Sequence, residues 1–325
     1  MTRSATVRSL AKINLDLRVL HKSSDGFHEL RTVFQTVSLF DSIEISYTEA
    51  RRSELILEDA LAIPNNLILR AAQAVLDTIR VSAQVRFRLI KKIPMGGGMG
   101  GGSSNAAAVL MALPVLAGRA LPFEKLQDLA AGLGSDIPFF LMGGTALGVS
   151  RGTELYPLAD VAPEPVLIVS PGFHIATGPA YAGLERTLTF PGSSRSINNF
   201  QSFVRALAET RSAGEASAFS ANDFEAVVTR QYPQLKSIWG KLWKLGAVGV
   251  RMTGSGSAVY GIFDSRESRE RARRVLQGDR VFQGYRVFPA ALVSRQGYRR
   301  LWRRQLAEHL RPDQELWPPR SRYER

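Results

Sequence analysis

Residues 93–110 read IPMGGGMGGGSSNAAAVL and place six glycines within the seven positions from 96 to 102. Each glycine loses more backbone freedom on folding than any other residue, which costs roughly 0.5 to 1 kcal/mol relative to alanine in regular structure. Such a run therefore needs a physical reason. Either the segment is a flexible surface loop, or its main chain must come close to another group.

Ordered structure is expected on both sides of the glycine run. VRFRLI (85–90) predicts a strand, and SSNAAAVLMAL (103–113) predicts a helix with Ser103 or Ser104 as its N-terminal cap. Main-chain N–H groups of a glycine loop, together with the unsatisfied donors at a helix N-terminus, can hold a phosphate without a cation. We therefore predict a phosphate site, where the serine hydroxyls could supply further donors or a magnesium ligand.

Two common phosphate loops fit this segment poorly. The pattern G-x-x-x-x-G-K-[ST] fails because no lysine follows the glycines. Gly96, Gly98 and Gly101 satisfy G-x-G-x-x-G, but a glycine run satisfies it through composition alone. No clear strand ending in an acidic residue follows about 20 residues later, so a dinucleotide-binding fold is disfavoured.

The composition is that of a globular protein with two domains. The 325 residues exceed the size at which single cores stop growing, and 45% of them are hydrophobic. The absence of cysteine excludes disulfides and cysteine-ligated metals, and four histidines offer no recognisable metal cluster. Charged residues interrupt the N-terminal apolar runs, and glycine and polar residues interrupt 93–118, so we expect a cytoplasmic protein without a signal peptide or membrane span.

The chain is basic, with a formal net charge of +13, which raises the alternative of nucleic-acid binding. In residues 295–325 nine arginines face four acidic residues. This tail, with Trp302, Trp317 and the pair Pro318 and Pro319, predicts an appended helix followed by a loose end. We interpret it as a solvated basic appendage rather than a nucleic-acid or membrane contact.

Alternating residues predict strands near the N-terminus. Apolar and polar residues alternate over 11–19, as in a half-buried strand, and put Lys12 and Asn14 on one polar face. A turn at SSDG (23–26) and further strands at 32–38 and 42–48 should follow.

Helix caps provide two further expectations. Asn65 or Asn66 can cap a helix whose apolar positions share one face. In GLGSDIPFF (132–140), Ser135 resembles a cap, which places Asp136 in a first helical turn where the helix dipole favours the carboxylate. Asp136 is then either a group that accepts a proton or a residue that only stabilises the helix start.

Four stretches together resemble the GHMP small-molecule kinases: AKINLDLRVLHKSSDGFHEL, KKIPMGGGMGGGSSNAA, LGSDIPFF and RMTGSGSAVYGIF. The resemblance runs from about residue 9 to about residue 294. The doubled glycine triplet and the A-K-I-N-L opening are typical of the branch whose acceptor is a cytidine-diphosphate-linked methylerythritol. An α+β architecture is implied, with an N-terminal half like domain 2 of ribosomal protein S5, including a left-handed βαβ crossover, and a ferredoxin-like C-terminal half. We expect domains at 1–160 and 161–294, and a basic extension at 295–325.

The resemblance implies ATP- and Mg²⁺-dependent phosphorylation of the 2-hydroxyl of that acceptor. Lys12 and Asp136 match the family's catalytic pair, with the aspartate taking the proton of the hydroxyl. The expected nucleotide-binding residues are Asn65, Lys91, Pro94, Met95, Gly96, Gly97, Gly98, Met99, Gly100, Gly101, Gly102, Ser103 and Ser104. The expected acceptor-binding residues are Asn14, Phe27, His28, Thr177, Tyr181, Gly254, Ser255 and Gly256. Phe27 stands where tyrosine is common in the family.

Other functions remain open at this point. A GHMP kinase for homoserine, mevalonate or a sugar would share the loop without needing the aromatic Phe27 and His28. An NAD(P)-dependent oxidoreductase and a basic nucleic-acid-binding protein are more distant alternatives. We expect a small-molecule substrate, no metal held by protein ligands alone, no nucleic acid, and a monomer or homodimer.

Overall fold

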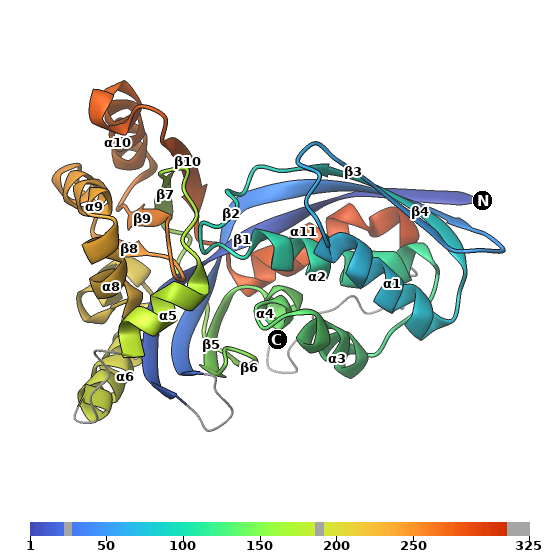
Figure 1. The fold of residues 1–325 in the computed structure, drawn as a ribbon, viewed down its shortest axis with the longest axis horizontal. Helices are drawn as coiled ribbons and strands as arrows, with labels where there is room; N and C mark the ends of the chain where they lie inside the picture. Colours follow the sequence, from blue (N-terminus) through green and yellow to red (C-terminus); the bar gives the residue numbers. More distant parts are fainter. Residues whose placement is uncertain (23–27, 186–191, 311–325) are drawn as a thin grey trace.

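Two long antiparallel strands run through the computed structural model, which describes residues 1–22, 28–185 and 192–310 (Figure 1). They are β1 (Thr2–Lys22) and β2 (His28–Glu49), so the separate strands expected at 32–38 and 42–48 are wrong: both belong to β2. The expected half-buried character of 11–19 is also wrong. Lys12, Asn14, Asp16 and Arg18 are all buried, because other elements cover the polar face of β1.

The N-terminal half is built on a six-stranded sheet with the order β3-β4-β2-β5-β6, in which β1 pairs with β2. Its other strands are β3 (Glu54–Asp59), β4 (Ala83–Ile90), β5 (Thr145–Ser150) and β6 (Glu154–Pro157). β3 and β4 are parallel neighbours joined by α1 (Leu67–Ile79), which is the βαβ unit that the resemblance implied.

Helices cover one face of this sheet, on the right of Figure 1. They are α1, α2 (Gly101–Leu116), α3 (Phe123–Leu133) and α4 (Ile137–Met142). Every residue of α2 from 104 to 116 is buried. The helix that follows the glycine run therefore lies in the centre of the N-terminal core.

The C-terminal half is a four-stranded antiparallel sheet with the order β10-β7-β9-β8, on the left of Figure 1. Its strands are β7 (Pro165–Ser170), β8 (Gly249–Met252), β9 (Val259–Ile262) and β10 (Arg286–Ala291). Between β7 and β8 lie α5 (Thr177–Glu185), α6 (Gly192–Thr210), α7 (Ala213–Ala216), α8 (Phe224–Gln231) and α9 (Gln234–Lys244). α10 (Arg266–Gly278) joins β9 to β10. This order is ferredoxin-like and confirms the predicted α+β architecture.

The last described helix, α11 (Arg295–Gln305), returns to the N-terminal half. Tyr298, Trp302 and Leu306 are at most 1% exposed and belong to the N-terminal core. The interpretation of this segment as a solvated appendage is therefore wrong: Arg300 and Arg304 are exposed, but one stripe of the helix is buried. Trp317, Pro318 and Pro319 lie outside the described residues. Among the described helices, none is long and apolar enough to span a membrane.

Candidate active site

Lys12 and Asp136 lie side by side although 124 positions separate them in the sequence. The Lys12 ammonium is 3.8 Å from a carboxylate oxygen of Asp136 and donates a 2.7 Å hydrogen bond to the Asn14 side chain. The Lys12 side chain is 4% exposed, whereas that of Asp136 is 37% exposed. The carboxylate therefore faces both the buried ammonium and the space in which a substrate could lie.

Burial lowers the pKa of the Lys12 ammonium, and the negative charge of Asp136 opposes that fall. Asp136 occupies the N-cap position of α4 and makes no capping hydrogen bond with its side chain. The expectation that Ser135 caps this helix is therefore wrong. The Asp136 carboxylate is therefore not used to cap its own helix.

The glycine run forms an ordered loop between β4 and α2. Gly96, Gly98 and Gly100 have φ values of +65°, +73° and +65°, in the left-handed region that favours glycine. A Cβ atom on Gly98 would lie 2.0 Å from the Thr253 carbonyl oxygen, and one on Gly100 would lie 2.7 Å from the Phe140 ring. The loop thus needs glycine because its main chain is pressed against other parts of the protein.

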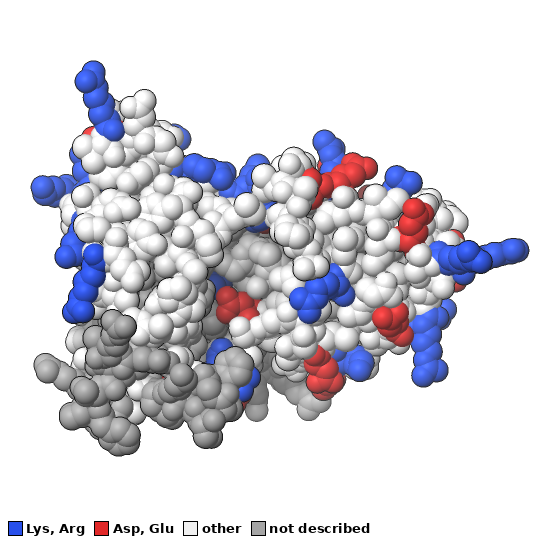
Figure 2. Space-filling view, viewed as in Figure 1, with Lys and Arg blue, Asp and Glu red and all other residues white. Residues whose placement is uncertain are grey.

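Ser103 and Ser104 do not cap α2. The N-cap residue is Gly100, and Ser104 lies inside the helix, where its hydroxyl donates a 2.7 Å bond to the Leu10 carbonyl. Within the described chain, no main-chain N–H from Gly96 to Ser103 donates a hydrogen bond to another residue. These donors lie near a hollow between the two halves, which Figure 2 shows near α2 and α4, and they could hold a phosphate.

The loop between the antiparallel strands β8 and β9 completes this region. The Asn14 side-chain oxygen accepts hydrogen bonds from Lys12 and from the Gly254 main chain, the latter at 2.9 Å. Thr253 donates a 3.1 Å bond to the Gly98 carbonyl. Asn14, predicted to bind the acceptor, therefore links the lysine to this turn, and Thr253 links the turn to the glycine run. Ser255 and Gly256 lie in the same turn.

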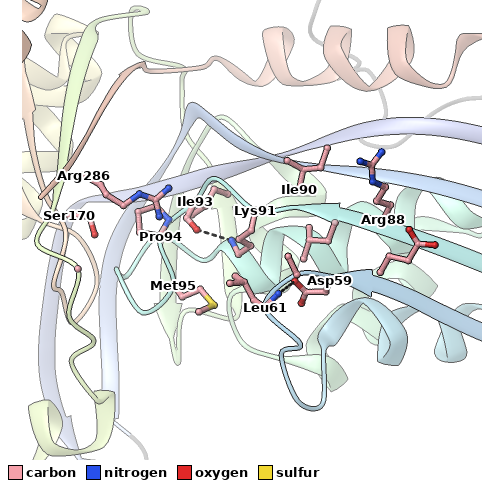
Figure 3. A pocket seen from close by; sticks show the side chains of 14 residues that line it. Asp59, Leu61, Arg88, Ile90, Lys91, Ile93, Pro94, Met95, Ser170 and Arg286 are labelled. Carbon is pink, nitrogen blue, oxygen red and sulfur yellow. Dashed lines mark hydrogen bonds between the residues drawn. The ribbon is translucent and has the colours of Figure 1, made fainter. Parts of the chain in front are cut away.

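A cavity of about 760 Å³ opens on the other side of the glycine loop (Figure 3). Leu61 and Met95, which are 50% and 56% exposed, line it together with Pro94. Arg286 and Ser170 reach it from the C-terminal half. A cavity lined by both apolar and charged residues suits a flat heterocycle joined to a charged group.

The predicted nucleotide residue Lys91 lines this cavity, but its ammonium is bound within the protein. It contacts the Asp41 carboxylate at 2.5 Å and the Ile93 carbonyl at 2.9 Å. Asp41 is fully buried and also accepts main-chain hydrogen bonds from Lys92 and Ile93, so it fixes the start of the glycine loop. Sequence reasoning missed Asp41, since nothing local distinguishes it from a surface carboxylate.

Asn65 lies before α1 with a positive φ of +50°, and Asn66 is the residue that caps this helix. Asn65 does not line the described cavity. Its role as a nucleotide-binding residue stays a prediction without support from this geometry.

His28 and Tyr181 form the aromatic part of the predicted acceptor site. Their rings stack with centroids 4.6 Å apart, although they lie on β2 and α5. Burial raises the pKa of Tyr181 to about 12, and the negative charge of Asp136 adds to this rise. The structure thus brings two of the predicted residues together within electrostatic reach of Asp136. Phe27 lies outside the described residues, as does the side chain of Thr177, the first residue of α5.

Sequence reasoning also missed His174. It lies in the stretch PGFHIATGPAY (171–181), which also contains Thr177 and Tyr181. Its ring nitrogen is 3.4 Å from the Gly96 carbonyl oxygen, and a Cβ atom on Gly96 would lie 2.1 Å from the same nitrogen. His174 therefore contacts the glycine loop from the C-terminal half.

Comparison with known proteins agrees with this arrangement. Residues 66–144 match the GHMP kinases N terminal domain, and residues 203–279 match the GHMP kinases C terminal family. A 4-diphosphocytidyl-2-C-methyl-D-erythritol kinase of Solibacter usitatus is 50% identical over 99% of this chain and 98% of its own. One of Prosthecochloris aestuarii is 36% identical over 84% of this chain and 94% of its own.

Solved structures add the same relationship at the level of the fold. A crystal structure of 4-(cytidine 5'-diphospho)-2C-methyl-D-erythritol kinase, 32% identical, has a TM-score of 0.72 and covers 90% of this chain and 99% of its own. A homoserine kinase of Cytophaga hutchinsonii shares the fold, with a TM-score of 0.72 at 19% identity, over 90% of this chain and 96% of its own. The resemblance in the motifs is confirmed: the chain belongs to the GHMP kinases, in the branch of the 4-diphosphocytidyl-2-C-methyl-D-erythritol kinases.

Proposed function

We propose that the protein transfers the γ-phosphoryl group of ATP to the 2-hydroxyl of 4-(cytidine 5'-diphospho)-2-C-methyl-D-erythritol, in the formation of isoprenoid precursors. The names of the relatives support this acceptor. The observation that carries the proposal is the Lys12 ammonium, 3.8 Å from the Asp136 carboxylate and beside the loop with open main-chain donors.

Asp136 acts as the group that takes the proton from the acceptor hydroxyl. Phosphoryl transfer has a loose transition state, so positioning and electrostatic stabilisation matter more than a strong base. Lys12 supplies positive charge at a fixed place, because Asn14 binds its ammonium and surrounding residues bury its stem. The same charge attracts the Asp136 carboxylate and stabilises the oxygens of the transferred group.

The nucleotide occupies both sides of the glycine loop. The open N–H groups from Gly96 to Ser103 bind its phosphates, and the cavity with Leu61, Pro94 and Met95 receives its base. The buried charge of Lys91 lies beside the start of α2, where a Cβ on Gly101 would be 2.7 Å from its nitrogen. Because the Asp41 carboxylate balances this ammonium, the pair fixes the start of the phosphate site without adding net charge to it.

The residues also fit a magnesium ion that arrives with ATP. No cluster of three or more His, Cys, Asp or Glu that could hold a metal occurs in residues 1–22, 28–185 and 192–310. Magnesium in kinases needs few protein ligands, since phosphate oxygens and water supply the rest. The half-buried Ser103 hydroxyl would be a ligand, whereas Ser104 is occupied by Leu10. When bound, the ion neutralises phosphate charge.

The acceptor lies in the hollow on the Asp136 side, with its cytosine near the stacked His28 and Tyr181 rings. Aromatic faces bind nucleobases by stacking, and a histidine nitrogen can read their hydrogen-bonding edge. We include Phe27 and Thr177 in this pocket on the strength of the resemblance. The protein is a monomer or homodimer in this proposal, and it has no nucleic-acid partner.

The test is a coupled assay of ADP release with and without the cytidine-linked acceptor, using the wild type and Asp136→Asn. We expect acceptor-dependent turnover in the wild type and a loss of roughly 10³-fold or more in the variant, with ATP affinity almost unchanged. Asp128→Asn, at an exposed position on α3, is the matched control and should behave as wild type. Equal turnover of wild type and Asp136→Asn would remove the assigned role of Asp136.

Homoserine, mevalonate and a sugar serve as alternative acceptors in the same assay. A rate with one of them that exceeds the rate with the cytidine-linked acceptor would overturn the proposed substrate while leaving the kinase assignment intact.

A further inference from the structure

The short helix α4 determines where the reactive carboxylate lies. It spans only Ile137–Met142, with Asp136 at its N-cap position. A helix of this length has no stability of its own in water, so its place depends on contacts with the rest of the protein. The Phe140 ring packs against Gly100, because a Cβ atom there would lie 2.7 Å from it. Any shift of α4 would therefore move both Asp136 and the wall of the phosphate loop.

The C-terminal end of α4 is held by Tyr298 of α11. The Tyr298 hydroxyl donates a 2.6 Å hydrogen bond to the Phe140 carbonyl, in a place where both residues are buried. This carbonyl is one of the last four of the helix, and these carbonyls find no N–H donor within an α-helix. The Tyr298 ring also lies directly on the main chain after α4: a Cβ atom on Gly143, whose φ is +66°, would be 2.3 Å from the ring.

α11 is itself fixed at both ends. At its start, the Arg295 main chain donates a 2.7 Å bond to Asp160, and its guanidinium donates to the Leu158 and Thr145 carbonyls. At its end, the Gln305 side chain accepts a 2.8 Å bond from the Arg8 main chain of β1. The Tyr298 hydroxyl is therefore a fixed point against which α4 rests.

We propose that Tyr298 is a positioning residue of the phosphoryl-transfer site, which acts through α4 to set the place of Asp136 beside Lys12 and of Phe140 beside the glycine loop. Through this contact the basic C-terminal helix becomes part of the machinery around the active site. The inference rests on the proposed function of Asp136. Its geometric content, the dependence of α4 on Tyr298, does not require the enzyme to be active.

The first test is Tyr298→Phe, which removes only the hydroxyl. We expect kcat to fall about 10- to 100-fold, as for other small displacements of catalytic groups, while both KM values change by less than about threefold. The matched control is Gln305→Ala, which removes the anchor of α11 that is distant from α4. It should lower thermal stability but leave kcat unchanged at temperatures well below its melting point.

Two further measurements separate positioning from simple destabilisation. Replacement of Tyr298 by 4-aminophenylalanine retains a donor at the same place and should restore kcat, whereas 4-methylphenylalanine should not. Hydrogen exchange of residues 137–143 should be at least about tenfold faster in Tyr298→Phe than in Gln305→Ala.

The outcomes distinguish the two proposals. An active wild type whose kcat and exchange at α4 are both unaltered by Tyr298→Phe would overturn the positioning role. A wild type without acceptor-dependent ADP release would overturn the proposed function, and hydrogen exchange alone would then decide whether Tyr298 holds α4. If Tyr298→Phe does not fold, the two phenylalanine analogues carry the same comparison.

Discussion

Gly98 shows at the scale of one residue why the loop is rich in glycine. Its φ of +73° is unfavourable for other residues, and a Cβ atom would lie 2.0 Å from the Thr253 carbonyl oxygen. Thr253 in turn donates a hydrogen bond to the Gly98 carbonyl. The position therefore serves two purposes, since it frees main-chain donors for a ligand and lets two loops from different halves touch.

We expect Gly98→Ala to abolish ATP binding and to destabilise the protein by at least roughly 1–2 kcal/mol from the backbone conformation alone. Gly132→Ala, on α3, is the matched control. Its Cβ would meet nothing within 4 Å, and alanine is favoured over glycine in a helix. Calorimetric titration with a non-hydrolysable ATP analogue and thermal melting measure both effects. Similar behaviour of the two variants would contradict the explanation given for Gly98.

At the scale of elements, the turn between β8 and β9 is held from two sides. Asn14 of β1 binds the Gly254 main-chain N–H, and Asn222, just before α8, donates to the Met252 and Gly254 carbonyls at 2.9 and 2.8 Å. The Asn222 side chain is 4% exposed. The turn is thus fixed by two asparagines that lie more than 200 positions apart in the sequence.

Asn222→Ala should raise the KM for ATP about tenfold and lower stability by about 1–3 kcal/mol, because two buried carbonyls lose their donor. Asn199→Ala, at an exposed position on α6, is the control and should change neither quantity. Steady-state kinetics and denaturant melts provide the measurements. A variant that loses stability but keeps the wild-type KM would show that Asn222 supports the fold and not the turn.

Local sequence patterns predicted which helices and strands form better than they predicted which residues are buried. The order of strand, glycine loop and helix was readable because each signal lies within a few residues. The cap residues of α2 and α4 were wrong, since a left-handed Gly100 and an uncapped Asp136 occupy these positions. α11 was misread because its many arginines hide the spacing of Tyr298, Trp302 and Leu306, which repeats every four positions and forms the buried stripe.

The periodicity of the sequence could not predict which residues far apart in the chain lie close together in space. Lys12 and Asp136 could be placed together only through the resemblance to a family, and their 3.8 Å separation agrees with it. The polar face of β1 was expected to meet solvent. It is buried because the segment before α8, some 200 positions later, supplies partners: the Ala221 N–H donates to Asp16, and the Arg18 guanidinium donates to the Phe219 carbonyl.

At the scale of the whole molecule, buried charged residues lie on both sides of the boundary between β1 and the C-terminal half. Asp16 and Arg18 form a bidentate pair at 2.9 Å, and Glu225 of α8 accepts a 2.8 Å bond from the Met252 main chain. Burial is the main cause that raises the pKa of Asp16 to about 6 and that of Glu225 to about 7. The positive charge of Arg18 opposes both rises, and that of Arg251 opposes the rise at Glu225. Both carboxyls therefore change charge near neutral pH.

Glu225 should make stability depend on pH. Its pKa is 4.5 in the reference state and about 7 in the folded state, so the folded protein holds this proton more tightly. The resulting stability is complete below about pH 4.5 and is lost as the pH rises through 7, a difference on the order of 3 kcal/mol. We expect the melting temperature of the wild type to fall relative to that of Glu225→Gln between pH 5 and pH 8. Melting curves of both proteins and of the exposed control Glu209→Gln test this, and parallel curves for wild type and Glu225→Gln would exclude it.

The course of β1 has a consequence for how ligands get in and out. This one strand contributes Val7 and Leu10 to the core of the N-terminal half, Ile13 and Leu15 to a second core between the halves, and Leu17 to the core of the C-terminal half. It is 21 residues long and pairs with the 22-residue β2 along almost its whole length, with three shifts of register, so the two halves share one pair of strands. A rotation of one half against the other would have to bend β1 and β2, although β1 is packed in all three hydrophobic cores. We therefore expect ligands to enter and leave with little relative rotation of the two halves.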